Sequence, residues 1–137
     1  MGNEEINIGA DFHTFRSQII QKFGEQYYDQ AEIFFTRATE QAQQGLFHSA
    51  LADGKFALEL TNYSNDTSGI HYIFGFLSQL HFDLRQVKKS LVYYELGLKL
   101  LDPEAADYEE DREMYRKLKE MIDSESWKQS AEDDLDS

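Results

Sequence analysis

The side chains that could perform acid–base or metal chemistry are scattered along this chain of 137 residues. Its histidines are His13, His48, His71 and His81, and none forms a His-Glu-x-x-His pair on one helix face. On a helix, the ten-residue spacing of His71 and His81 separates them by about 80° around the axis and by roughly three turns along it. We therefore expect His81 to pack in the interior or to snorkel to the surface instead of binding a metal, and no metal site is predicted.

Other catalytic patterns are missing as well. The eight glycines are isolated, so the sequence contains no glycine-rich phosphate loop, and it contains no Gly-x-Ser-x-Gly elbow. Carboxylate pairs such as Glu109 and Glu113 fall on a charged helix face, where solvated charge is their expected role. The absence of cysteine excludes disulfides and thiolate catalysis, and it fits a reducing compartment. The sequence thus predicts a cytoplasmic protein that is not an enzyme and uses no cofactor.

Charge limits the kinds of partner. The chain has 26 acidic and 13 basic side chains, a formal net charge of −13. From Asp102 onward there are 14 acidic and 5 basic residues, a net charge of −9. A field of this sign repels phosphate groups, so we expect neither nucleic-acid binding nor docking to an anionic membrane. No segment approaches the roughly 18 apolar residues of a membrane span. A basic protein is the favoured partner, and the alternative is that the charge only keeps the protein soluble.

Apolar residues recur at spacings of three and four, which indicates an all-α fold in a single domain over residues 1–123. One proline and eight glycines leave too few turns for an all-β protein. The six expected helices are 11–23, 27–44, 47–61, 68–83, 86–101 and 103–123. Asp11 is predicted to cap the first helix, Gly24 to end it, and Asp102-Pro103 to begin the last one.

Three segments are expected to lie outside these helices. Residues 1–10 are predicted to be frayed, and the polar stretch 62–69 is the clearest loop. From Ser124 the composition turns to Ser, Glu and Asp, so residues 124–137 are predicted to form an acidic, disordered tail. Trp127 is the exception in this tail. We expect it to dock on the last helix, and the alternative is that it anchors a partner.

Two hairpins in the middle of the chain share one pattern. In the first hairpin the pattern is Gly45, Phe47 and Ala50. In the second, aligning Ser90 with Ala50 places Tyr94 at a later aromatic position and Gly97 at a later small-residue position of the same pattern. The offset between Ala50 and Ser90 is 40 residues. This pattern resembles the tetratricopeptide repeat (TPR) family, in which a turn, an aromatic residue and an alanine open the second helix of each pair. The resemblance covers residues 31–103 and implies antiparallel hairpins stacked as a short solenoid, and an unrelated helical bundle is the alternative.

In TPR proteins the first helix of each pair lines a concave surface that takes the ligand. Carried over to this chain, the resemblance implies a partner-binding groove of Phe35, Thr39, Tyr72, Phe76, Gln79 and Phe82. Such an aromatic, uncharged groove suits an apolar helix or extended peptide flanked by basic residues. The Lys, Asn and Arg clamp with which some TPR proteins hold acidic chaperone tails is absent. The alternative is that the first and last helices fold over the groove and bury its aromatic residues as core.

Two functions follow from these patterns. The first is a protein–protein interaction module, an adaptor or small chaperone that binds a peptide or helix of a partner in the aromatic groove. The alternative is an acidic inhibitor or immunity-type protein that masks a basic surface, and its binding would weaken with salt. A structural subunit of a larger assembly is a third possibility. An exposed aromatic patch would equally suit a second copy of the chain.

Overall fold

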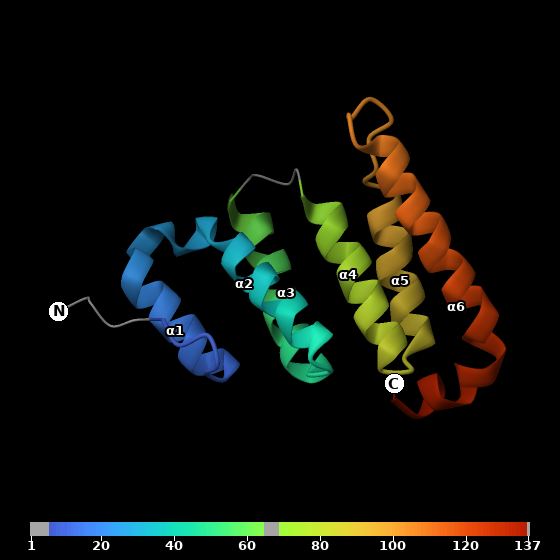
Figure 1. Ribbon diagram of the computed structural model, residues 1–137, viewed down its shortest axis with the longest axis horizontal. Coiled ribbons are helices and arrows are strands. Elements are labelled where there is room, and N and C mark those ends of the chain that lie inside the picture. Colours follow the sequence, from blue (N-terminus) through green and yellow to red (C-terminus); the bar gives the residue numbers. More distant parts are fainter. Residues whose placement is uncertain (1–5, 65–68, 137) are drawn as a thin grey trace. The chain divides into compact units, whose positions relative to one another are not determined.

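The computed structural model shows an all-α protein, as the sequence predicts (Figure 1). It describes the backbone of residues 6–64 and 69–136, and the surroundings of side chains as far as residue 124. The chain divides into two compact units, Met1–Thr67 and Ser68–Ser137, called here the N-terminal unit and the C-terminal unit. One domain over residues 1–123 stays a prediction. Among the described helices, none has the length and apolar character of a membrane span.

The N-terminal unit contains α1, a 3₁₀ segment and a helical hairpin. Its elements are α1 (Phe12–Phe23), η1 (Gly24–Asp29), α2 (Ala31–Gln43) and α3 (Phe47–Ser64). The Asp11 carboxylate accepts a 2.9 Å hydrogen bond from the Thr14 amide, which confirms the predicted N-cap. Gly24 ends α1 with a positive φ of 57°, also as predicted. Phenylalanine rings form the core, and the ring of Phe34 lies edge-on to those of Phe15 and Phe56, with centroids 5.1 and 4.8 Å away.

Three boundaries in this unit differ from the prediction. The second helix begins at Ala31 instead of residue 27, because residues 24–29 form a tighter turn that ends where the Gln30 amide donates to the Tyr27 carbonyl. The third helix continues to Ser64, so part of the expected loop is helical, and residues 65–68 lie outside the described part. Residues 6–10 are held in place instead of frayed, because the Arg37 side chain binds the carbonyls of Ile8 and Ala10.

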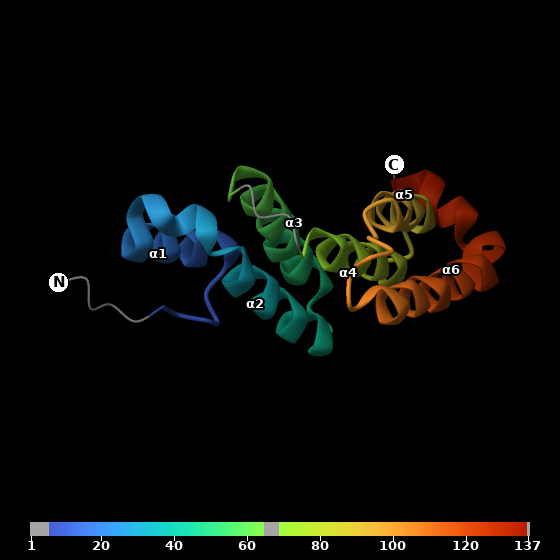
Figure 2. The same ribbon diagram turned by 90° about the horizontal axis from the view of Figure 1, so that it is seen from above.

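The C-terminal unit consists of a second hairpin and a long helix. Its elements are α4 (Ile70–Asp83), α5 (Val87–Leu98) and α6 (Tyr108–Asp136), grouped side by side in the view from above (Figure 2). Its buried apolar cluster is Val87, Tyr94, Tyr115, Leu118 and Ile122. His81 is buried and stacks on Tyr93 at a centroid distance of 5.2 Å, so it packs in the interior as predicted.

The last helix differs from the prediction at both ends. It begins at Tyr108 instead of Pro103, because Asp102 forms a turn in which its side chain accepts from the Glu104 amide and its carbonyl from the Ala105 amide. It also continues to Asp136, beyond the predicted end at residue 123 and through the stretch predicted to be disordered. The Lys119–Asp123 ion pair, at i and i+4, stabilises the helix as far as the predicted end. The predicted docking of Trp127 lies outside the described side chains.

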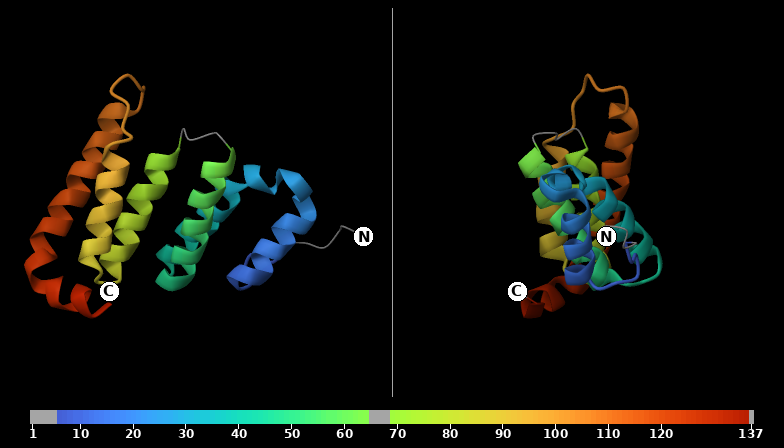
Figure 3. Two further views of the ribbon diagram at one scale, coloured as in Figure 1. Left: turned by 180° about the vertical axis from the view of Figure 1, so that it is seen from behind. Right: turned by 90° about the vertical axis from the view of Figure 1, so that its left-hand side faces the viewer.

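The turns that join the helices of the two hairpins (Figure 3) share four backbone hydrogen bonds at an offset of 40 residues. Gly45 and Arg85 both have a positive φ, of 80° and 63°. The Leu46 amide donates to the Gln41 carbonyl at 2.9 Å, and the Gln86 amide donates to the His81 carbonyl at 2.7 Å. This is the six-residue bond of a Schellman cap. The predicted 40-residue repeat is therefore present in the backbone of both hairpins.

Each hairpin also has a pair of small residues where its two helices approach closely. In the first hairpin the pair is Ala38 and Ala50, both fully buried. In the second it is Ser78 and Ser90, and each hydroxyl donates to the carbonyl of the other residue at 2.7 Å. These reciprocal bonds satisfy both hydroxyls, so serine replaces alanine without leaving an unpaired polar group.

Tyr115 of α6 fills a slot in the second hairpin. Its hydroxyl donates to the His71 carbonyl at 2.6 Å, and its side chain is fully buried. Gly97 makes the slot, because a Cβ added there would lie 1.8 Å from the Tyr115 hydroxyl oxygen. The Tyr115 side chain thus packs α6 against both helices of the hairpin.

We expect this buried tyrosine to make the C-terminal unit sensitive to alkali. Burial raises the pKa of Tyr115 above its ordinary value, whereas in the unfolded chain it ionises at about 10. Above that pH the unfolded state binds fewer protons than the folded state, so the free energy of unfolding should fall as pH rises. Chemical denaturation of the wild type and of Tyr115→Phe, at pH values below and above about 10, tests this pH dependence of the free energy of unfolding. Equal pH slopes for the two proteins would contradict this prediction.

Candidate binding site

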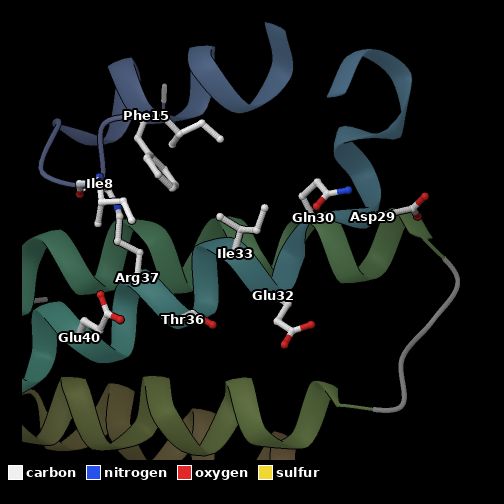
Figure 4. A pocket seen from close by; sticks show the side chains of 10 residues that line it. Ile8, Phe15, Asp29, Gln30, Glu32, Ile33, Thr36, Arg37 and Glu40 are labelled. Carbon is white, nitrogen blue, oxygen red and sulfur yellow. Dashed lines mark hydrogen bonds between the residues drawn. The ribbon is translucent and has the colours of Figure 1, made fainter. Parts of the chain in front are cut away.

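An open pocket of about 390 Å³ lies in the N-terminal unit, between the N-terminal segment, α1 and α2 (Figure 4). Its size is in the range of ligand-binding pockets. Phe15 reaches from α1 toward Ile33 and Arg37 on α2, with Ile8 beside the arginine. These side chains and Ile6 make the interior mainly apolar, and the other lining residues are Asp29, Gln30, Glu32, Thr36 and Glu40.

Arg37 fixes one wall of this pocket. Its Nε and Nη2 donate to the two carboxylate oxygens of Asp53 on α3, at 2.5 and 2.9 Å. Its Nη1 donates to the carbonyls of Ile8 and Ala10 at 3.1 and 2.5 Å. The guanidinium also lies 3.9 Å from the centroid of the Phe15 ring, a cation–π contact. One side chain thus joins α1, α2, α3 and the N-terminal segment.

The Arg37–Asp53 pair is buried, with side-chain exposures of 3% and 0%. Burial raises the pKa of Asp53 above its ordinary value, and the guanidinium of Arg37 opposes that rise. Because the carboxylate already pairs with Arg37, the cation contributes little free positive charge to the pocket. The electrostatic field at the opening is therefore set by the carboxylates.

Three of the residues that line the pocket carry carboxylates, namely Asp29, Glu32 and Glu40. All three residues are exposed. Ile33 and Glu40 are seven residues apart and lie on one stripe of α2, whereas Asp29 belongs to the 3₁₀ segment before it. The pocket thus combines an apolar floor with an acidic rim from α2 and η1. Such a rim attracts a cationic group, and the floor accepts an aliphatic stem or a neighbouring apolar side chain.

The sequence patterns described above did not predict this pocket. The available signal was a pair of opposite charges inside apolar stripes: Arg37 next to Phe34 and Ala38, and Asp53 between Ala50 and Ala57. A charged residue on the buried face of each helix of a hairpin indicates an internal ion pair, because burying either charge alone is very costly. The apolar periodicity gave no indication that residues 6–10 would form one side of the pocket.

The residues predicted for the groove fall in both units, and none lines the pocket. Phe35 and Thr39 are half-buried on α2. Phe35 follows Ile33 by two residues, about 200° around the helix, so the pocket opens on another side of α2. The other four residues, Tyr72, Phe76, Gln79 and Phe82, belong to α4 in the C-terminal unit. A single groove made of all six residues stays a prediction.

Helix α6 contacts the side of α4 that carries several of these residues. The Gln79 amide lies 3.6 Å from the Met121 sulfur, and Phe82 is partly buried against the apolar cluster of the unit. Tyr72 remains exposed, and a hydrogen bond with Asp111 raises its pKa. Within this unit, α6 thus covers part of the expected groove, and Phe82 serves the core, as in the alternative derived from the sequence.

The nearest arrangement to a catalytic pair is His71 with Asp111, whose Nε2 and Oδ2 atoms are 2.9 Å apart. Both side chains are largely buried between α4 and α6, with exposures of 14% and 8%. This pair joins the two helices, as the Tyr115 hydroxyl does on the neighbouring turn. Among the residues that the structure describes, no group of three or more His, Asp and Glu side chains could hold a metal ion.

Similarity to known proteins offers no further guide to this site. Comparisons of the chain with models of protein families, with curated proteins and with solved structures give no match.

Proposed function

We propose that this chain is a TPR-like protein–protein interaction module, an adaptor or small chaperone whose N-terminal unit binds a basic, apolar segment of a partner protein. The observation that carries the proposal is the pocket with the acidic rim of Asp29, Glu32 and Glu40 above an apolar floor. The repetition of the hairpin turn at 40 residues supports the TPR-like assignment. TPR-type hairpins commonly hold extended or helical peptides, which fits this pocket chemistry.

The ligand that fits is a lysine or arginine next to an aliphatic or aromatic residue. Its charged group binds the rim carboxylates, and its stem and neighbour cover Ile33 and Ile8. Because the only cation among the lining residues is already paired with Asp53, an acidic segment finds no partner charge in the pocket. The proposed ligand keeps the basic residues that the sequence led us to expect, and it binds the pocket instead of the aromatic groove.

This proposal predicts which peptides the full chain selects from a random display library. The enriched pocket ligands should carry Lys or Arg beside Leu, Ile, Met or Phe. Binding of one such peptide, measured by calorimetry, should weaken about ten-fold in the double variant Glu32→Gln/Glu40→Gln, which corresponds to about 1.4 kcal/mol. Both residues are exposed, so the fold is expected to be unaffected.

A matched control keeps the same change in net charge. Glu25→Gln/Glu59→Gln removes two exposed carboxylates from the same unit, and neither residue lines the pocket. The control should bind like the wild type. If both double variants lose affinity equally, the basic peptides respond only to the overall charge, and the pocket is not their site.

The second candidate, an acidic inhibitor that masks a basic surface, is favoured by the first turns of α6. Glu109, Glu110 and Glu113 are exposed there, around the partly exposed Met114. Such a surface would bind through long-range charge, so its complex should dissociate with added salt. A partner that is released by Glu109→Gln/Glu113→Gln and is indifferent to Glu32→Gln/Glu40→Gln would favour this second candidate.

A further inference from the structure

The outward face of α5 is basic, whereas the chain as a whole is acidic. Its exposed residues, including the two that follow the helix, are Lys88, Lys89, Val92, Glu95, Leu96, Lys99 and Leu100. Residues 85–99 contain four basic side chains and one acidic side chain, a net charge of +3 in a chain of net charge −13. A cationic surface of this kind is not needed for solubility in an acidic protein.

This face also carries an exposed apolar stripe. Val92, Leu96 and Leu100 are spaced by four residues and are 55%, 42% and 46% exposed. The opposite side of α5, which includes Val87 and Tyr94, packs in the core of the C-terminal unit. The stripe is therefore not needed for packing within the unit. Single exposed leucines are ordinary, whereas an apolar stripe along one helix face is a candidate interaction surface.

We propose that this α5 face is a second docking surface, which binds an acidic amphipathic helix of a partner protein. Charge complementarity argues for this occupant, because carboxylates of the partner would pair with Lys89 and Lys99 on either side of the stripe. The spacing argues for a helix, because side chains at i, i+4 and i+8 present ridges about 6 Å apart that fit between those of a second helix. An anionic membrane would offer similar charges, and the experiment below separates it from an acidic helix.

This surface is independent of the pocket of the N-terminal unit and selects the opposite charge. An adaptor with both surfaces would bind a basic segment through one unit and an acidic helix through the other. The two sites then give the molecule two different partners, which is the property that an adaptor needs beyond simple binding.

The test uses the full chain and a synthetic helical peptide with Leu at positions i and i+4 and Glu at the flanking positions. Fluorescence anisotropy should detect binding that weakens with added salt, as expected for exposed charges. Both Val92→Ser/Leu96→Ser and Lys89→Glu/Lys99→Glu should weaken it about ten-fold or more, equivalent to about 1.4 kcal/mol. The controls Leu46→Ser and Lys22→Glu/Lys55→Glu change an exposed leucine and two exposed lysines of the other unit and should bind like the wild type.

Three results would overturn the proposal. The first is that the Glu peptide does not bind, and the second is that it binds both double variants as tightly as the wild type. The third is that anionic phosphatidylserine vesicles bind through this face and the peptide does not, which would make it a membrane surface. A peptide with Lys in place of Glu should not bind the α5 face. If the Lys peptide also fails to bind the pocket of the N-terminal unit, that result counts against the proposed function and leaves the inference about α5 intact.

Discussion

Replacing Gly97 by alanine should destabilise the C-terminal unit by about 3 kcal/mol. A Cβ at this position would lie 1.8 Å from the Tyr115 hydroxyl oxygen, 2.8 Å from Cζ of the same ring and 2.9 Å from Cβ of Phe74. None of these atoms has room to move, because the tyrosine is fully buried and its hydroxyl is bound to the His71 carbonyl. Urea denaturation monitored by circular dichroism gives the loss directly.

Gly75 provides the matched control on the facing helix. An added Cβ there would lie 3.4 Å from the Met114 Cε and from the Tyr115 hydroxyl oxygen, which is ordinary contact. Since alanine is better than glycine inside a helix by about 1 kcal/mol, Gly75→Ala should be neutral or stabilising. In the background Tyr115→Phe, the cost of Gly97→Ala should shrink, because the nearest clashing atom is gone. A Gly97→Ala protein as stable as the wild type would contradict the claim that Gly97 leaves room for the Tyr115 ring.

The second large effect is expected at the buried ion pair of the N-terminal unit. Either Arg37→Met or Asp53→Leu leaves one charge buried without its partner, and we expect each to cost about 3–5 kcal/mol. The double variant should be more stable than either single variant, because it leaves no uncompensated charge in the interior. Thermal denaturation of the four proteins measures the coupling between the two residues.

The double variant also tests whether the ion pair is needed for peptide binding as well as for stability. Without the guanidinium, the carbonyls of Ile8 and Ala10 lose their donor, so the N-terminal segment should detach from α2. Faster hydrogen exchange of the Ala10 amide, which bonds the Asn7 carbonyl, would report this release. A refolded double variant should therefore bind the basic peptide more weakly. If the single variants are as stable as the wild type, the pair does not hold the unit together.

Helical periodicity predicted the elements well and their ends less well. The all-α class, the cap at Asp11, the break at Gly24 and the 40-residue repeat all follow from residue types and spacing. The start of α6 was missed, because Asp102-Pro103 suits both a helix start and an isolated turn, and only tertiary packing decides between them. The continuation of α6 past residue 123 was not predicted, because this polar, acidic segment has no apolar periodicity that would indicate a helix.

The binding site was harder to predict than the fold. The resemblance to TPR proteins directed attention to Phe35 and Thr39, whereas the pocket opens on another side of the same helix. Its walls depend on where Arg37 reaches, and a long side chain with three hydrogen-bonding directions has no periodic signature. The two opposite charges on buried faces were visible in the sequence. Their consequence, an anchored N-terminal segment that closes a pocket, depends on tertiary contacts that no local pattern encodes.

The most direct test of the pocket is to map a selected basic peptide onto the full chain by NMR. We predict that the backbone amides of Ile8, Ile33, Thr36 and Glu40 shift on titration, and that these shifts weaken together in Glu32→Gln/Glu40→Gln. Shifts centred instead on Phe35 and Thr39 would contradict the proposed site, because they would place the ligand in the aromatic groove and leave the acid-rimmed pocket empty.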